Sequence, residues 1–290
     1  MRFTMAAALA GAAFLAAAPA AAQDAGDDTG FNGFYIGAAG GYDVQPNDRG
    51  SSIFFDRGLD GRFGDTVTTA AGANAFGGAV GGFCNGRATA ATGPGNSAGA
   101  SRPCRNDKDG VAYYGRVGFD AQRGNVVVGV VGEFGKTEIN DSVSAFSTTP
   151  ASYTMYREIN WEAAVRGRLG YAASGSTLFY GTFGPGYAKI DRSFFTTNTA
   201  NAFAQRGDRT QFGITGGGGI EQKLGRHLSF GLEYMHHRYD DKDYRVRATA
   251  GTAPATNPFV LGTGGAGTDF RRTDTKFVWH SIRATAAFRF

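Results

Sequence analysis

The chain of 290 residues has little cysteine, proline or charge. Its two Cys residues are too few for a disulfide-dense small scaffold or for a zinc site built from cysteines alone. Charged residues make up 19% and aromatic residues 13% of the chain, which excludes an intrinsically disordered protein, because such proteins lack apolar groups to bury. The 46 glycines show no every-third-residue period, so the chain is not collagen-like. The glycine and aromatic content instead predicts an all-β protein with many turns.

A long apolar run occurs only near the N-terminus, at residues 6–18. Arg2 precedes the run, and the small residues of 20–22 follow it. This order predicts a cleaved secretory signal peptide at residues 1–22, with a retained anchor as the alternative. Residues 23–290 contain no apolar stretch of about 20 residues, so we expect no membrane-spanning helix. Export without an anchor leaves the periplasm, the medium or the outer membrane as destinations.

Eight segments alternate apolar and polar residues with a period of two, the pattern of a β-strand with two unlike faces. Pro185 interrupts the alternation of the fifth and makes it the weakest. Most of the segments are long enough for a tilted membrane strand, which needs about 9–11 residues, and exceed the usual 5–6 of soluble strands. The predicted strands are residues 32–44, 111–122, 126–136, 152–172, 177–189, 210–223, 227–239 and 274–290.

The charged residues of these segments lie on the face opposite the aromatic and aliphatic residues. In a soluble sandwich this polar face would meet water, whereas in a membrane barrel it would point into the lumen. The lumen of an eight-stranded barrel is only wide enough for side chains, so charges inside it must pair. The nearly balanced set consists of Arg116, Asp120, Glu133, Glu158, Glu162, Arg166, Arg168, Glu221, Glu233, Arg283 and Arg289.

The opposite parity predicts the lipid-facing side of each strand. In the fourth segment it assigns Tyr153, Met155, Ile159 and Trp161 to lipid. Phe183 of the fifth segment is expected to point inward with the charges. Aromatic residues near strand ends suit interfacial girdles, and the candidates are Tyr42, Tyr153, Tyr171, Phe230 and Phe290.

The connections between the predicted strands alternate strictly between long and short. Residues 123–124, 173–176 and 224–226 are tight turns, whereas 45–110, 137–151, 190–209 and 240–273 are long. This alternation is typical of outer-membrane barrels with short periplasmic turns and longer external loops. The first loop has room for an extra hairpin, with residues 76–83 as a candidate, so a ten-stranded barrel remains an alternative.

These segments resemble the OmpA-like and opacity-type eight-stranded porin-family barrels of Gram-negative outer membranes. The resemblance rests on the order and spacing of residues 32–37 (NGFYIG), 115–120 (GRVGFD), 165–171 (VRGRLGY), 230–234 (FGLEY) and 282–290 (IRATAAFRF). It implies a barrel over residues 23–290 in contact with membrane lipids and lipopolysaccharide. It also implies that Ile282, Phe288 and Phe290 form the signal read by the barrel-assembly machinery. We expect no periplasmic peptidoglycan-binding domain.

Few residues outside the strand pattern suggest chemistry. Cys84 and Cys104 share the first long loop of an exported chain, which predicts a disulfide, with two free thiols as the alternative. Arg206-Gly207-Asp208 matches an adhesion tripeptide, but Gly-Asp is also ordinary turn chemistry. Residues 216–219 are glycines without a following helix, so they are not a phosphate loop and we attribute them to close packing in the barrel wall.

Three further patterns are weaker as sites. His227, Ser229 and Glu233 partly match the His-x-Ser and acid set of lipid A deacylase barrels, but the parity points them into the lumen, away from outer-leaflet lipid. His236 and His237 are adjacent on a strand and therefore face opposite sides. The acidic residues of 106–110 and 240–243 lack calcium-loop spacing. We expect no catalytic, metal or cofactor site.

The sequence therefore favours a non-enzymatic outer-membrane surface protein that supports envelope integrity and displays external loops. A channel for small solutes or ions is an alternative, as is an adhesin that binds a host or surface ligand through the loops. A lipid-modifying enzyme is the remaining hypothesis. The mild net charge of +4 has no clustered basic face, so we expect no nucleic-acid partner.

Overall fold

The computed structural model describes residues 30–45, 51–93, 104–173 and 175–290. The predicted signal peptide at residues 1–22 lies outside these ranges. Among the described residues, none belongs to a helix that is long and apolar enough to cross a membrane.

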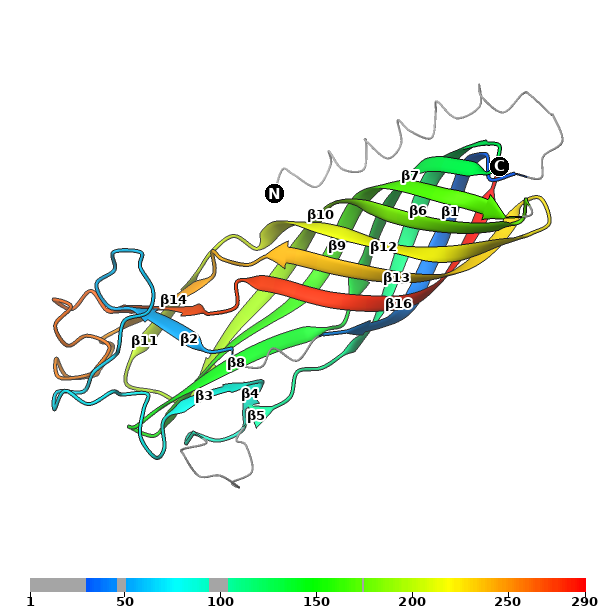
Figure 1. The fold of residues 1–290 in the computed structure, drawn as a ribbon. Coiled ribbons are helices and arrows are strands. Elements are labelled where there is room, and N and C mark those ends of the chain that lie inside the picture. Colours follow the sequence, from blue (N-terminus) through cyan, green and yellow to red (C-terminus); the bar gives the residue numbers. More distant parts are fainter. Residues whose placement is uncertain (1–29, 46–50, 94–103, 174) are drawn as a thin grey trace.

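Eight long antiparallel strands close into a barrel (Figure 1). Their order around the wall is β10-β12-β13-β16-β1-β6-β7-β9, and pairing between β9 and β10 closes the ring. The fold predicted from the alternation is confirmed, and most strand ends differ from the prediction by only one or two residues. The strands are β1 (Gly33–Val44), β6 (Gly110–Arg123), β7 (Val126–Thr137), β9 (Ala151–Ala173), β10 (Thr177–Thr196), β12 (Thr210–Leu224), β13 (Leu228–Asp240) and β16 (Lys276–Arg289).

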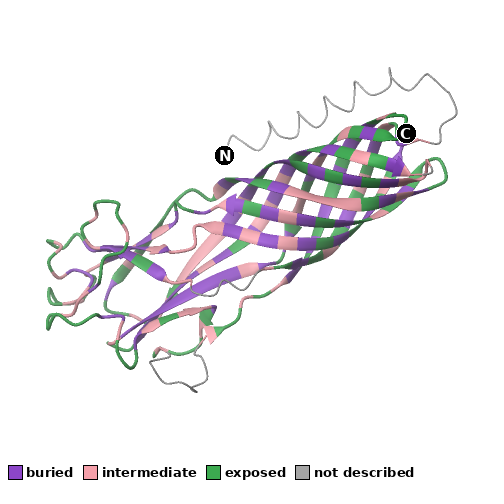
Figure 2. Cartoon of the chain, viewed as in Figure 1, coloured by how far each residue is buried: buried purple, intermediate pink, exposed green. Residues whose placement is uncertain are grey.

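Burial alternates along the barrel strands, most regularly in β6 and β13 (Figure 2). Outward side chains are apolar and strongly exposed, as at Leu232 and Ile282, which are both 61% exposed. Inward side chains are buried and mostly polar or charged. The molecule is thus inverted relative to a soluble protein, and its outer surface suits lipid rather than water.

Tight turns join the strands at one end of the barrel, next to the C-terminus (Figure 1). Gly124 (φ 59°) and Gly225 (φ 77°) occupy left-handed backbone positions in the turns after β6 and β12. Glycine is favoured there because it has no Cβ to clash with the backbone. Pro185 cannot donate a backbone hydrogen bond, and the pairing between β9 and β10 skips Gly184 and Pro185. The strand nevertheless continues through them, because β12 pairs on its other side.

The long loops at the opposite end fold into a second body, which we call the cap. It contains β2 (Ile53–Asp56), β3 (Gly82–Asn85), β4 (Arg87–Ala88), β5 (Cys104–Arg105), β8 (Asn140–Ser147), β11 (Ala202–Arg206), β14 (Arg245–Thr249) and β15 (Thr268–Arg272), together with the distal parts of β9 and β10. Strands β11, β14, β15 and β2 form a separate four-stranded sheet. These segments were predicted as loops, since strands this short carry little periodicity of their own.

The ten-stranded alternative is wrong for the barrel. Strand β8 pairs with β9 at residues 151–158, beyond the point where β7 stops pairing with it, and β3 adds to β8. These two strands therefore extend the wall into the cap without widening the ring. The hairpin proposed for residues 76–83 is not formed either: Phe76 is buried in the cap core, and strand β3 begins only at Gly82.

A β-bulge reverses the facing of β9 where the barrel meets the cap. Trp161 is opposite Lys189 of β10 and Ile159 is opposite Ile190, which leaves Asn160 as an extra residue. One extra residue moves every following side chain to the other face of a strand. The assignment of Tyr153, Met155 and Ile159 to lipid is therefore wrong, because all three are buried.

Candidate functional site

Four inward charges meet near the turn end of the barrel, and we call them the lower cluster (Asp120, Arg168, Glu221 and Arg289). Arg289 lies 2.9 Å from Asp120 and 2.7 Å from Glu221, and Arg168 lies 2.8 Å from Asp120 and also binds Glu221. The Tyr35 ring lies beside both guanidinium groups. Each acid thus has two arginine partners, and the cluster is formally neutral.

A second set of five charges, the middle cluster, fills the next level (Arg116, Glu133, Arg166, Glu233 and Arg283). Arg283 lies 2.8 Å from Glu133 and 2.9 Å from Glu233, while Arg166 adds a contact of 2.9 Å to Glu133. Arg116 lies 3.1 Å from Glu233. The five side chains come from β6, β7, β9, β13 and β16, so the cluster crosses the lumen from wall to wall.

Glu162 occupies the third level and accepts three hydrogen bonds. The donors are His237 Nδ1 at 2.7 Å, Tyr239 Oη at 2.8 Å and Tyr114 Oη at 3.1 Å. His237 also stacks on Trp279, with ring centroids 4.8 Å apart. An apolar layer of Ile139, Ile159, Ile190, Phe277 and Trp279 lies on the cap side of this group.

Inward glycines make room for the interior tyrosines. A Cβ on Gly118 would lie 2.3 Å from the Tyr35 ring, and one on Gly186 would lie 2.2 Å from Tyr239 Oη. In the glycine run of β12, a Cβ on Gly219 would meet Tyr180 Oη at 3.0 Å and the Leu232 carbonyl oxygen at 2.5 Å. Close packing in the barrel wall therefore accounts for these residues, as predicted for 216–219.

A further set of charges, the rim cluster, lies where the barrel meets the cap (Asp141, Arg157, Arg192, Asp241, Arg272 and Asp274). Arg157 lies 3.0 Å from Asp241 and 2.8 Å from Asp274, and both it and Arg272 contact Asp141. Burial alone would raise the pKa of Asp141, but the charges of Arg157 and Arg272 outweigh it and lower the pKa. The alternation of the fourth predicted strand did not indicate this cluster, because the β9 bulge brings Arg157 inward in place of Glu158.

Glu158 and Phe183, both predicted to point into the lumen, lie elsewhere. Glu158 is exposed and accepts a hydrogen bond from Tyr156 Oη at 2.7 Å, since it precedes the bulge and faces outward. Phe183 is 64% exposed on the outer wall, because the inward parity of β10 runs through Thr182 and Gly184 instead. The other predicted charges all belong to the lower cluster, the middle cluster or the Glu162 group.

Most of the residues predicted for interfacial aromatic girdles face outward. Tyr42, Tyr171, Phe230 and Phe290 are exposed, but Tyr153 is only 1% exposed and lies in the cap core. The three residues predicted to form an assembly signal, Ile282, Phe288 and Phe290, are all exposed on the outer surface of the barrel. The Phe290 ring contacts those of Phe34 and Phe288.

The cap has an apolar core, unlike the barrel. Phe55, Phe76, Tyr153, Phe259 and Phe270 pack together through stacked and edge-to-face contacts at centroid distances of 4.4–6.0 Å. A disulfide joins Cys84 of β3 to Cys104 of β5, with Cα atoms 6.4 Å apart. It closes a loop over a sequence separation of 20 residues, which chain-entropy estimates value at about 3 kcal/mol.

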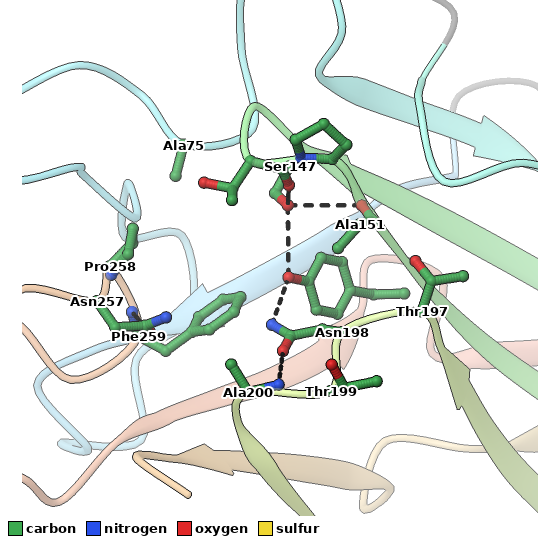
Figure 3. Close-up of a pocket in the computed structure, with 13 residues that line it drawn as sticks. Ala75, Ser147, Ala151, Thr197, Asn198, Thr199, Ala200, Asn257, Pro258 and Phe259 are labelled. Carbon is green, nitrogen blue, oxygen red and sulfur yellow. Dashed lines mark hydrogen bonds between the residues drawn. The ribbon is translucent and has the colours of Figure 1, made fainter. Parts of the chain in front are cut away.

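A cavity of about 220 Å³ opens on the cap surface (Figure 3). Tyr153 is one of the lining residues, and its Oη accepts a hydrogen bond from Asn198 Nδ2 at 2.9 Å. Asn198 Oδ1 in turn accepts from the backbone N of Ala200 at 2.9 Å. These polar groups bind one another, so they hold the loops of the cap together.

The weaker sequence patterns do not assemble into sites among the described residues. His227 lies in the turn before β13, stacks on Phe288 and contacts the Arg289 carbonyl oxygen at 3.0 Å. It therefore does not point into the lumen as predicted. Glu233 is held in the middle cluster, and Ser229 is buried. His236 and His237 do face opposite sides: His237 is buried inside, while His236 Nδ1 lies 3.5 Å from His280 Nδ1 on the outer wall.

The adhesion-like tripeptide forms an exposed turn after β11. Arg206 lies 3.8 Å from Asp269, and Gly207 has a left-handed φ of 125°. The Asp208 carbonyl oxygen accepts hydrogen bonds from Arg192 and from Gln211 Nε2. The tripeptide is thus accessible, and its backbone is tied to the rim of the barrel.

Comparison with known proteins agrees with this inverted architecture. The family described as outer membrane protein beta-barrel domain matches residues 7–262. The chain belongs to this family. It is an outer-membrane protein of the Gram-negative type.

Two curated relatives are outer-membrane proteins by name. The 31 kDa outer-membrane immunogenic protein of Brucella melitensis is 30% identical over 42% of this chain and 50% of its own length. The 22 kDa outer membrane protein of Rhizobium leguminosarum is 30% identical over 48% of this chain and 58% of its own. The chain thus spans about half the length of the curated relatives it matches.

A solved structure also overlaps with most of the chain. The outer membrane protein OprG of Pseudomonas aeruginosa matches 91% of this chain and 100% of its own, with 13% identity and a TM-score of 0.48.

Proposed function

We propose that the chain is a non-enzymatic, non-conducting barrel that supports the outer membrane and presents a folded cap at the cell surface. The observation that carries this proposal is the filling of the lumen. The middle cluster joins side chains from five strands across the interior, and all five are 6% exposed or less. The lower cluster, the Glu162 group and the apolar layer lie below and above it, so a solute would have to separate several buried ion pairs to pass.

The outer wall supports lipid as the surrounding partner. Three basic residues, Lys136, Lys189 and Arg238, lie on the outer wall toward the cap side of the barrel, where positive charge suits the phosphates of lipopolysaccharide. We propose that they bind these phosphates. We also propose that the terminal outward residues, Ile282, Phe288 and Phe290, are read by the assembly machinery before the barrel closes.

Conductance of the purified protein in planar bilayers tests the closed lumen. We expect no unitary openings from the wild-type barrel. The double variant Glu133→Ala/Arg166→Ala removes a contact of 2.9 Å together with one charge of each sign, and we expect it to acquire small openings. The matched control is Glu158→Ala/Arg209→Ala, which removes an acid and a base outside the lumen and should stay silent.

Clear openings from the wild type would contradict the proposal and support a channel for small solutes. Heat-modifiable migration on gels shows whether each variant is folded, because folded barrels of this type resist detergent until they are heated. The adhesin hypothesis stays a separate prediction and rests on the exposure of the turn at Arg206, Gly207 and Asp208.

A further inference from the structure

The four-stranded sheet of the cap has one covered and one outward face. Val246, Phe270 and Phe55 point into the cap core. The residues between them, Arg245, Arg247, Asp269, Arg271 and Phe54, therefore point away from it. The sheet lies toward the end of the molecule farthest from the C-terminus, and thus far from the membrane (Figure 1).

Arginines line up across three neighbouring strands of this face. Arg206 of β11 is directly opposite Arg245 of β14. Val246 is opposite Phe270 in the antiparallel pair of β14 and β15, so Arg245 and Arg271 are the next residues along both strands. Like charges at such cross-strand positions destabilise a sheet, so the row has an electrostatic cost within the protein.

The two halves of the face differ in how this charge is compensated. Asp269 binds Arg247 in a bidentate pair and lies 3.8 Å from Arg206. In the described part of the chain, no carboxylate forms an ion pair with Arg245 or Arg271. The charge of Arg247 is thus compensated by Asp269, whereas the charges of Arg245 and Arg271, each two residues away along β14 or β15, are not compensated among the described residues.

A single aromatic ring holds the two unpaired arginines. The Cζ atom of Arg271 lies 4.2 Å and that of Arg245 lies 5.2 Å from the centroid of Phe63. Arg271 Nε is buried and has no hydrogen-bond partner. Burial, and then the neighbouring charge of Arg245, lower the pKa of Arg271. The pair is therefore oriented by packing while its hydrogen-bonding capacity remains unused.

We propose that Arg245 and Arg271, bracketed by Phe63 and flanked by Arg206, form a binding site for the sulfate or phosphate groups of an anionic polysaccharide. A guanidinium binds such oxyanions through two parallel hydrogen bonds, and two adjacent guanidiniums double this match. A row of cations fits a chain with repeated charges better than a single ion. The distance from the membrane favours a polysaccharide over a lipid headgroup.

Binding to immobilised dextran sulfate, with uncharged dextran as the reference, tests the site. The full-length protein should bind dextran sulfate, and salt should weaken the binding because charges are neutralised. We expect Arg245→Gln/Arg271→Gln to bind about tenfold or more weakly, which corresponds to the loss of about one charged hydrogen bond. Arg245→Lys/Arg271→Lys keeps the charge without the paired donors, so its affinity should lie between those of the wild type and Arg245→Gln/Arg271→Gln.

The matched control is Arg105→Gln/Arg226→Gln, which removes the same charge from two exposed arginines on separate elements, β5 and the turn before β13. It should bind like the wild type. Equal losses in both double variants would show that only net charge matters and would overturn the proposal. So would unchanged binding by Arg245→Gln/Arg271→Gln, or equal binding of uncharged dextran. The outcome is independent of lumen conductance, and proteolysis of the cap checks that each variant is folded.

Discussion

The barrel and the cap reach stability by opposite arrangements of the same residue types. In the barrel, charged residues are buried and leucines and valines face outward, so the interior is held by ion pairs and hydrogen bonds. In the cap, phenylalanines form the core and arginines lie on the outer face. The solvent explains the contrast. Lipid is itself apolar, so burying apolar side chains inside the barrel gives no hydrophobic free energy, whereas water around the cap makes such burial favourable.

The rim cluster and the apolar layer mark the boundary between the two arrangements. Within a few residues of β9, the inward side chain changes from Glu162 to Ile159, Arg157 and Met155. The bulge at Asn160 makes this change possible. Because of the extra residue, odd-numbered side chains of β9 point outward in the barrel but inward in the cap. The long strands β9 and β10 thus belong to both bodies.

Removing one charge from the barrel interior should have the largest effect on stability. Arg283→Ala leaves Glu133 and Glu233 with less compensation in a buried site, and we expect a loss of about 3–5 kcal/mol in the free energy of unfolding. Urea denaturation of the refolded protein in detergent measures it. The control Arg105→Ala removes an exposed cap arginine and should change the midpoint little. Equal midpoints for both variants would mean that the buried ion pairs do not hold the barrel together.

The same substitution should have opposite consequences inside the cap and outside the barrel. Ile53 is 2% exposed in the cap core, and Ile53→Ala should destabilise the cap by about 2–5 kcal/mol. Ile282 is 61% exposed on the lipid-facing wall, and Ile282→Ala should have a much smaller effect, since no protein cavity forms. Limited proteolysis monitors the cap and heat-modifiable migration monitors the barrel. A comparable loss from Ile282→Ala would refute the inverted arrangement.

The smallest expected effect is a pH dependence confined to the cap side. Burial, together with the nearby charge of Asp141, raises the pKa of Asp107 from 3.8 to about 7. A carboxyl with a raised pKa in the folded state contributes full stability below pH 3.8 and loses it as the pH rises toward 7. Asp107→Asn keeps an oxygen that can accept the 2.7 Å hydrogen bond from the Ser142 backbone N.

Proteolysis rates of the cap at several pH values compare the two proteins. We expect the Asn variant to resist protease better than the wild type at pH 8, and the difference to vanish near pH 4. A constant difference across this range would show that Asp107 does not titrate within it.

The barrel strands could be read from the sequence because each alternates for long enough to be recognised. The charges of the lower and middle clusters followed from the same parity. Glu158 and Tyr153 were misplaced for a physical reason. Asn160 is an extra, unpaired residue, so the side chains before it in β9 face the opposite way, and the local sequence pattern does not indicate this. Phe183 was misplaced because Pro185 obscures the alternation of β10.

The cap strands were missed because β2, β11, β14 and β15 are only four or five residues long, too short to show a period. Their partners are also remote in sequence, as in the pairing of Arg272 with Ile53. The same holds for the row of arginines on their outer face. Arg206, Arg245 and Arg271 become neighbours only when the three strands pair.

Local sequence was thus sufficient for the eight barrel strands, most of their ends, most of the lipid-facing wall and all but one of the acids and bases that it placed in the lumen. Each of these features depends on residues two positions apart on one strand. Contacts between distant segments decide which arginine meets which acid, how the loops fold over a core of their own, and how Arg245 and Arg271 come together. Such contacts are set by strand register, bulges and packing in three dimensions.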